Sequence, residues 1–259
     1  MTPILFALAA VAAQSGPTDD TEARYRACTA LVRTAPDKAI ASADAWRLQG
    51  GGLDARQCLG LAYAAALRWA PAATAFEQAA REAETKKDGR SADFWTQSGN
   101  AWLAGGEHAK AIAAFDAALA TSALQGELRG EVHVDRARAA AGMGNMAAAR
   151  ADLDKAVSLV PVDPMAWYLS AAVARREGNL QRASTEIAKA LELAPREASI
   201  LLEAGNITGM LGDLPAAKAL YARAAQSDPE SPAGRAAAAA LAANGTEEAA
   251  PTDAKPQSR

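Results

Sequence analysis

The sequence predicts an all-α protein built from stacked antiparallel helix hairpins. Alanine, the strongest helix former, supplies more than a quarter of the 259 residues, whereas aromatic residues make up only 5%. Runs of β-branched residues, which strands require, are missing. The decisive observation is a repeat: Gly144, Gly178 and Gly212 are spaced by 34 residues, and Gly106 precedes them by 38.

Each of these glycines lies in the same order of residues. Upstream there is a large residue and, four positions later, a small one. Downstream there is an alanine, then a bulky residue, then a second alanine. The large upstream residues are Trp95, His133, Trp167 and Leu201; the small ones are Gly99, Ala137, Ala171 and Gly205; the bulky downstream ones are Phe115, Leu153, Ile187 and Tyr221. Pro161, Pro195 and Pro229 close the last three copies.

These spacings predict two helices per copy. Trp95, Gly99 and Trp102 recur at three and four positions, which places them on one face of a first helix. Gly106 ends that helix, because only glycine adopts the left-handed conformation at little cost. A second helix follows, with Phe115 between inward alanines that allow close approach. The prolines cannot continue this helix, so they separate one hairpin from the next.

A 34-residue helix-turn-helix unit with this residue order resembles the tetratricopeptide repeat (TPR). The resemblance implies a right-handed α-solenoid in which the first helix of each hairpin lines a concave groove. It covers four in-register copies, at residues 92–129, 130–163, 164–197 and 198–231. The extra residues of the first copy are expected in a longer loop between Thr121 and Gly130.

The flanking segments extend the predicted array. Residues 53–91 form a degenerate TPR with Leu67 in place of the turn glycine, and residues 14–52 form a linker and a divergent capping helix pair. Residues 232–245 are expected to be a C-terminal capping helix, because an array must cover its last apolar face. The polar, proline-containing residues 246–259 are predicted to be disordered.

The N-terminal residues favour export. Residues 1–13 contain an apolar run that ends in small residues, as a signal peptide does, and the run is too short for a stable membrane anchor. The alternative is a hydrophobic tail on a cytosolic protein. In an exported protein, Cys28 and Cys58 are most simply a disulfide, and otherwise a pair of small buried thiols.

The sequence offers little for catalysis. His108 is expected to be an exposed first-turn residue and His133 a packing residue, and neither has a catalytic partner at a recognisable spacing. No cysteine and histidine cluster has metal-ligand spacing, and no cofactor is predicted. The net charge of −3 with mixed signs and no basic stripe argues against nucleic-acid binding.

The resemblance instead points to the groove face of the first helices. Two columns of residues are expected there: Gln57, Thr96, Val134, Tyr168 and Leu202, and Leu61, Asn100, Arg138, Ala172 and Asn206. Arg175, Arg176 and Glu203 lie near them. Asn and Arg can hydrogen-bond a peptide, and Tyr168 adds apolar surface. The alternative is an ordinary solvated helix face.

Two functions follow as hypotheses. The first is a non-catalytic scaffold, exported to a bacterial-type periplasm, that binds a protein or peptide partner through Gln57, Thr96, Asn100, Arg138, Tyr168, Arg175 and Asn206. The second is a structural repeat module that associates with itself, and is cytosolic if residues 1–13 are not a signal peptide.

Overall fold

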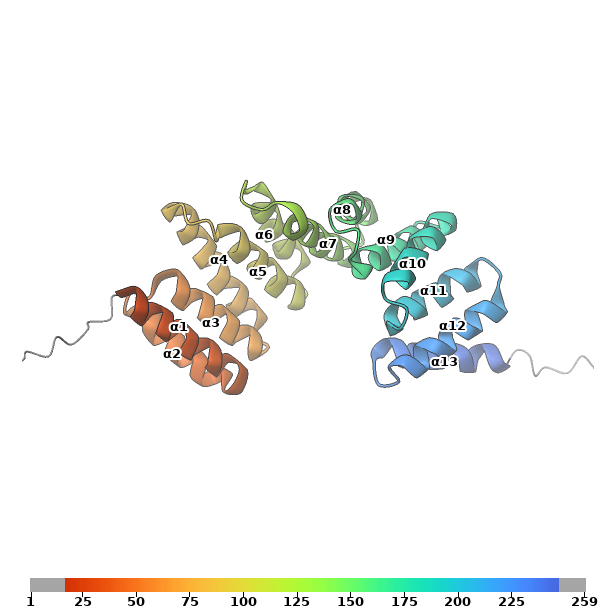
Figure 1. The fold of residues 1–259 in the computed structure, drawn as a ribbon, viewed down its shortest axis with the longest axis horizontal. Coiled ribbons are helices and arrows are strands. Elements are labelled where there is room, and N and C mark those ends of the chain that lie inside the picture. Colours follow the sequence, from red (N-terminus) through yellow and green to blue (C-terminus); the bar gives the residue numbers. More distant parts are fainter. Residues whose placement is uncertain (1–16, 247–259) are drawn as a thin grey trace, which may run out of the picture. The chain divides into compact units, whose positions relative to one another are not determined.

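The computed structural model describes residues 17–246, which form thirteen α-helices and no strand (Figure 1). The predicted signal peptide at residues 1–13 and the tail after residue 246 lie outside the described residues. The chain divides into two compact units, residues 1–105 (unit 1) and 106–259 (unit 2). The predicted all-α fold of stacked helix hairpins is confirmed within each unit.

Unit 1 contains five helices that follow one another as packed neighbours. They are α1 (Pro17–Thr34), α2 (Pro36–Leu48), α3 (Gly52–Ala65), α4 (Trp69–Lys86) and α5 (Ser91–Ala104). Helix α3 packs against α1, α2 and α4, and α4 packs against α5. Pro36 separates α1 from α2, because its ring cannot continue a preceding helix but suits the first position of the next.

Unit 2 contains the remaining eight helices. They are α6 (His108–Ala120), α7 (Gly126–Gly142), α8 (Met146–Leu159), α9 (Pro164–Arg176), α10 (Leu180–Leu193), α11 (Ala198–Met210), α12 (Leu214–Ser227) and α13 (Pro232–Thr246). Successive helices pack together, and α7, α9 and α11, the first helices of three hairpins, also contact one another in turn. Helix α13 covers α12 and α11 at the end of the unit.

The tight turns inside the hairpins use left-handed backbone geometry, as the repeat predicts. Gly144, Gly178 and Gly212 have φ angles of 77°, 78° and 94°. Leu67, which replaces the glycine between α3 and α4, adopts the same conformation at φ 57°. A side chain with a Cβ is strained there, so the degenerate repeat keeps the turn at a cost in free energy.

Small residues on the first helix let the second helix approach closely. A Cβ added to Gly60 would lie 2.6 Å from the ring of Phe76, and one added to Gly205 would lie 2.5 Å from the ring of Tyr221. The alanines around these contacts are fully buried. In both hairpins the ring on the second helix therefore packs directly against the glycine backbone of the first helix.

The predicted long loop between Thr121 and Gly130 is wrong. The connection from α6 to α7 is five residues, 121–125, and α7 begins at Gly126 with 17 residues, against 13 in α9 and α11. Most of the insertion thus adds a turn to the start of α7. Arg129 on that turn donates to the carbonyl of Leu119 at 3.0 Å, which ties the added turn to the end of α6.

Candidate partner-binding site

The first-helix face of unit 2 is built by α7, α9 and α11 and carries most of the predicted site residues. Arg138 on α7 is exposed and donates to Asp135 at 2.9 Å, one turn earlier on the same helix. Tyr168 and Arg175 on α9 and Asn206 on α11 are half-buried. Val134, placed in the same column by the sequence, is buried instead and belongs to the core.

A polar cluster joins α9, α11 and α12 around a buried carboxylate; we call it the Glu203 cluster, made of Tyr168, Arg175, Glu203, Asn206 and Tyr221. Glu203 is 6% exposed, and the Nε of Arg175 donates to it at 2.6 Å. Asn206 donates to Glu203 at 3.3 Å and accepts from the hydroxyl of Tyr221 at 3.1 Å. Because these hydrogen bonds link Arg175, Glu203, Asn206 and Tyr221, those four side chains have a fixed geometry.

Tyr168 is the member of this cluster whose hydroxyl has no hydrogen-bond partner among residues 17–246. Burial raises its pKa, and the negative charge of Glu203 raises it further. The hydroxyl is therefore neutral over the physiological range and can donate or accept a hydrogen bond.

The remaining predicted residues belong to unit 1. The hydroxyl of Thr96 donates to the carbonyl of Ala92 on its own helix at 2.9 Å, which occupies its donor. Gln57 is half-buried and Asn100 is exposed. The structure thus brings Tyr168, Arg175 and Asn206 into one cluster within unit 2. Gln57 lies on α3, and Thr96 and Asn100 lie on α5, outside that cluster.

His133 has a buried acidic partner that its sequence spacing did not reveal. Its Nδ1 lies 2.9 Å from Asp152, which also accepts from the Nε of Arg136 at 2.8 Å. Burial opposes ionisation of Asp152, but the hydrogen bonds from His133 and Arg136 outweigh it and lower its pKa. The sequence does mark Asp152 as an acid at a core position, because it stands just before the bulky Leu153, where two other copies carry the apolar Ala114 and Leu220 and the third carries Glu186. The sequence does not show which helix supplies its partner.

The same repeat position in the next hairpin holds Glu186, which is also buried. It accepts from Arg182 at 2.7 Å and lies 3.6 Å from Arg150. Arg150 in turn donates to the hydroxyl and the carbonyl of Ser170 at 2.7 Å each. These contacts tie α8, α9 and α10 together and therefore have a structural role.

The expectation of an exposed His108 is wrong. The residue does begin α6, but its ring fills the space beside Gly142, where an added Cβ would lie 2.6 Å from it. Its Nδ1 is buried without a hydrogen-bond partner among the described residues. The glycine at the end of α7 explains this position, because it leaves room for an imidazole.

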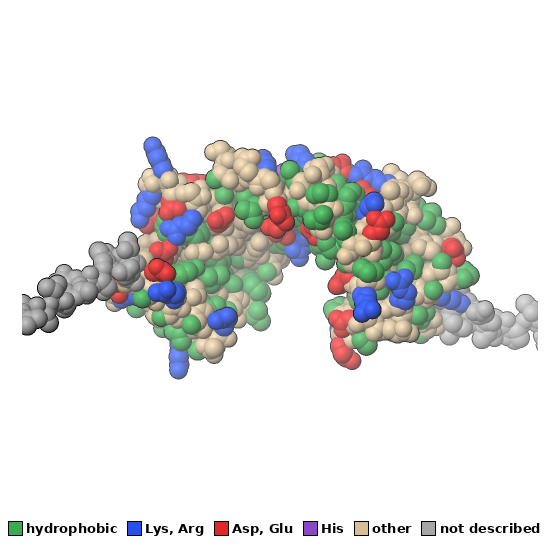
Figure 2. Space-filling model, in the orientation of Figure 1, with side chains coloured by type: hydrophobic (Ala, Val, Ile, Leu, Met, Phe, Trp, Pro, Cys, Tyr) green, Lys and Arg blue, Asp and Glu red, His purple; other side chains and the backbone are tan. Residues whose placement is uncertain are grey.

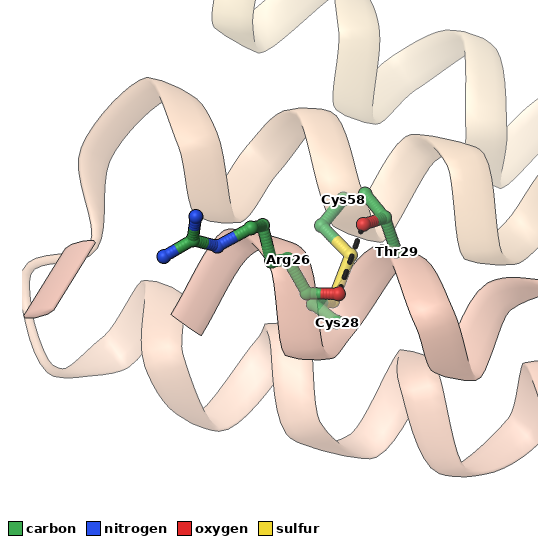
Figure 3. The surroundings of a disulfide bond; sticks show 4 residues. All are labelled: Arg26, Cys28, Thr29 and Cys58. Atoms are coloured by element: carbon green, nitrogen blue, oxygen red, sulfur yellow. Dashed lines mark hydrogen bonds between the residues drawn. A yellow bond between two sulfur atoms is a disulfide. The ribbon is translucent and has the colours of Figure 1, made fainter. Parts of the chain in front are cut away.

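Cys28 and Cys58 lie side by side between α1 and α3, with their sulfur atoms bonded and their Cα atoms 6.3 Å apart (Figure 3). Both are buried and pack with Ala43 and Leu59. The hydroxyl of Thr29 donates to the carbonyl of Arg26 within α1, and the Arg26 side chain extends away from the sulfur atoms (Figure 3).

The surface carries both signs of charge, interspersed over the face that Figure 2 displays. No group of three His, Cys, Asp or Glu side chains within residues 17–246 is arranged to hold a metal ion. In the same part of the chain, every helix is too short or too polar to cross a membrane.

Comparison with known proteins gives matches of sequence pattern and of fold. The tetratricopeptide repeat model matches residues 59–125, 134–198 and 173–232, which together are more than half of the chain. No curated protein matches the sequence.

Three solved structures illustrate the likeness of fold. PilF of Pseudomonas aeruginosa superposes with a TM-score of 0.69 at 15% identity, covering 87% of this chain and 100% of its own. PilW, described as a widely conserved type IV pilus biogenesis factor, gives 0.67 at 22%, covering 86% and 99%. YrrB, described as a TPR protein with an unusual peptide-binding site, gives 0.55 at 17%, covering 76% and 96%. The predicted TPR-like solenoid fold is thereby confirmed.

Proposed function

The chain belongs to the tetratricopeptide repeat family, and from this premise we propose that it is a non-catalytic scaffold that binds a protein or peptide partner. YrrB, which shares the fold, is described as having a peptide-binding site, and PilW as a pilus biogenesis factor. Function resides in sites rather than in folds, so the proposal depends on the surface of this chain.

The observation that carries the proposal is the Glu203 cluster on the first-helix face. Arg175 and Asn206 present polar atoms at fixed positions, because Glu203 holds both side chains. Tyr168 adds a hydroxyl that has no hydrogen-bond partner among the described residues. Preorganised groups lose little conformational entropy on binding. Arg138, exposed on α7, adds a charge that can reach a peptide carboxylate. We propose that the partner binds here, and that Gln57, Thr96 and Asn100 on the first helices of unit 1 also contact it.

A pull-down from an envelope fraction tests this assignment. The wild-type chain is compared with the triple variant Asn100→Ala, Arg138→Ala, Tyr168→Ala. We expect the variant to lose the partner that the wild type captures, because it removes two polar groups and one apolar surface. The matched control changes three exposed residues of the second helices, Gln78→Ala, Lys155→Ala and Thr185→Ala, and should capture it normally. A partner retained by both triple variants would remove the first-helix face from the proposal.

We also propose that the protein is exported to the periplasm and carries the Cys28–Cys58 disulfide there. The likeness to PilW supports an envelope setting, and an oxidising compartment allows the bond to persist. Intact-mass spectrometry of the native protein tests both parts. We expect a chain that begins after the apolar run and is two hydrogen atoms lighter than its reduced form. A chain that begins at Met1 with two free thiols would contradict export.

The alternative is a structural repeat module that associates with itself. The molar mass in solution, measured by light scattering over a range of concentrations, separates the two hypotheses. A monomer at all concentrations would exclude self-association, whereas a stable dimer would favour it over the scaffold.

A further inference from the structure

One repeat position changes from tryptophan to leucine in the last hairpin of the array. Trp167 begins the inner face of α9 and donates from Nε1 to the carbonyl of Pro161 at 2.9 Å. Exactly one repeat of 34 residues later, Leu201 occupies the same position on α11, and Pro195 corresponds to Pro161. The leucine has neither the volume of an indole nor its N–H donor.

The structure has a cavity at this position. Its volume is about 350 Å³, which lies at the lower end of the range for pockets that hold small ligands. The cavity is open to solvent, and Leu201 lies beneath it with only 1% of its surface exposed, so the other lining residues supply the accessible walls. It is lined by Pro195, Arg196, Leu201, Arg223, Gln226 and Ser227. The space therefore lies between the loop before α11 and the last two turns of α12.

The hydrogen bond that the indole makes in the preceding repeat is made here by an arginine. The Nη2 of Arg223 donates to the carbonyl of Pro195 at 3.0 Å. The carbonyl is thus satisfied without filling the space in front of it. Because a guanidinium has five N–H donors, Arg223 keeps others available for a ligand.

The charge around the position changes as well. In the preceding repeat the corresponding residues are Lys189 and Glu192, which neutralise each other in an ion pair of 2.8 Å. In the last repeat they become Arg223 and Gln226, and the position of the apolar Val162 becomes Arg196.

Neither Arg196 nor Arg223 forms an ion pair with a carboxylate within residues 17–246. The last repeat therefore combines an unfilled apolar space with two positive charges at its rim.

We propose that this cavity binds an aromatic side chain of a partner peptide that carries a carboxylate beside it. The aromatic ring would occupy the cavity beside Pro195 and the aliphatic parts of the other lining side chains, at the repeat position where the preceding repeat carries an indole. The carboxylate would accept hydrogen bonds from Arg196 and Arg223, whose planar groups suit both carboxylates and ring faces. The inference rests on the proposed peptide-binding function, but it concerns residues outside the Glu203 cluster.

A titration of the full chain with a defined peptide tests the inference. The probe is acetyl-Gly-Trp-Glu-Glu-amide, added to isotope-labelled protein and followed by amide NMR shifts. We expect shifts concentrated at residues 195–201 and 223–227. Two control peptides, with Lys-Lys in place of Glu-Glu and with Ala in place of Trp, should each bind about tenfold more weakly, since each lacks one recognised group.

Two variants test the cavity itself. Leu201→Trp restores the residue of the preceding repeat and fills the space, and Arg196→Gln with Arg223→Gln removes the charge without touching the buried floor. Each change should weaken binding of the probe about tenfold or more. The arginine variant also loses the exposed hydrogen bond from Arg223 to Pro195, so its thermal unfolding midpoint should fall by no more than a few degrees. The Gln78→Ala, Lys155→Ala, Thr185→Ala variant, which changes exposed residues of other second helices, is the control and should bind the probe as the wild type does.

Three results would overturn the inference. They are no shift at these residues, equal binding of the acidic and lysine peptides, and full binding by the arginine variant. A molar mass that doubles with concentration and returns to a monomer in Leu201→Trp would assign the cavity to a second copy of the chain instead. The pull-down with the triple variant tests the scaffold proposal independently of all of these.

Discussion

Leu67 shows what a single residue costs when a repeat departs from its pattern. Its φ of 57° is left-handed, and its side chain is 70% exposed, so the leucine is strained without contributing much burial. We predict that Leu67→Gly stabilises the protein by about 0.5–1 kcal/mol, because relief of about 1–2 kcal/mol of strain exceeds the entropy cost of glycine. Denaturant unfolding measures the change.

The neighbouring residue provides the control for this substitution. Ala66 has a φ of −83°, which suits any residue, so Ala66→Gly should destabilise by up to about 1 kcal/mol. Equal effects of the two substitutions would show that Leu67 carries no strain.

Two glycines of α11 should respond oppositely to alanine. At Gly205 the new Cβ would lie 2.5 Å from the Tyr221 ring, which its hydroxyl bond to Asn206 holds in place. We predict a loss of about 1–2 kcal/mol, since overpacking exceeds the gain in helix propensity. At Gly209 the new Cβ would meet Ala217 at an ordinary 3.5 Å, so the same change should stabilise by up to about 1 kcal/mol. Thermal unfolding of both variants decides, and a stabilised Gly205→Ala would contradict the packing argument.

At the scale of elements, the disulfide joins α1 to α3 across a sequence separation of 30 residues. Closing a loop of this length lowers the entropy of the unfolded chain, and this raises the free energy of unfolding by about 3–4 kcal/mol. We predict that Cys28→Ala with Cys58→Ala loses most of this stability in urea unfolding. Reducing the disulfide of the wild type should give the same loss of unfolding free energy. A double-alanine variant as stable as the oxidised wild type would contradict the prediction.

The contact between Asp152 and its two partners joins α7 to α8 and predicts a pH dependence. The native pKa of Asp152 is lowered from its ordinary 3.8, so the ionised form stabilises the fold above that value, and the gain is lost as pH falls through the native pKa. Asp152→Asn should therefore destabilise by about 3 kcal/mol at pH 7, because His133 and Arg136 lose their buried carboxylate and Arg136 keeps only the exposed Asp116.

This difference between wild type and Asp152→Asn should shrink below pH 3.8, and urea unfolding at pH 7, 5 and 3 measures it. The matched control is Asp116→Asn, the exposed partner of the same arginine. It should cost less than 1 kcal/mol at every pH, as exposed pairs do.

At the scale of the whole molecule, the periodicity of the sequence predicted the hairpins. It did not predict which side chains of neighbouring helices meet. Gly144, Gly178 and Gly212 fixed the turns, since their conformation is local. The partners of His133 and His108 could not be predicted, because they depend on which neighbouring helix supplies Asp152 or leaves room at Gly142. The Glu203 cluster was only partly foreseen: the spacing placed Arg175, Glu203 and Asn206 on one face, but the hydroxyl of Tyr221 reaches Asn206 from the core position of α12.

A chain whose repeats contact only their neighbours should also lose stability locally. The helices of units 1 and 2 pack chiefly with the helices next to them in the sequence, so a weakened hairpin can open without its distant counterparts. We predict that Cys28→Ala with Cys58→Ala speeds amide hydrogen exchange in α1–α3 by about a hundredfold, the factor that a loss of about 3 kcal/mol gives, and leaves exchange in α9–α12 unchanged. Gly205→Ala should do the reverse. Exchange followed by mass spectrometry resolves the two regions in one experiment, and a uniform acceleration over all the helices in either variant would mean that the array opens as a single cooperative body.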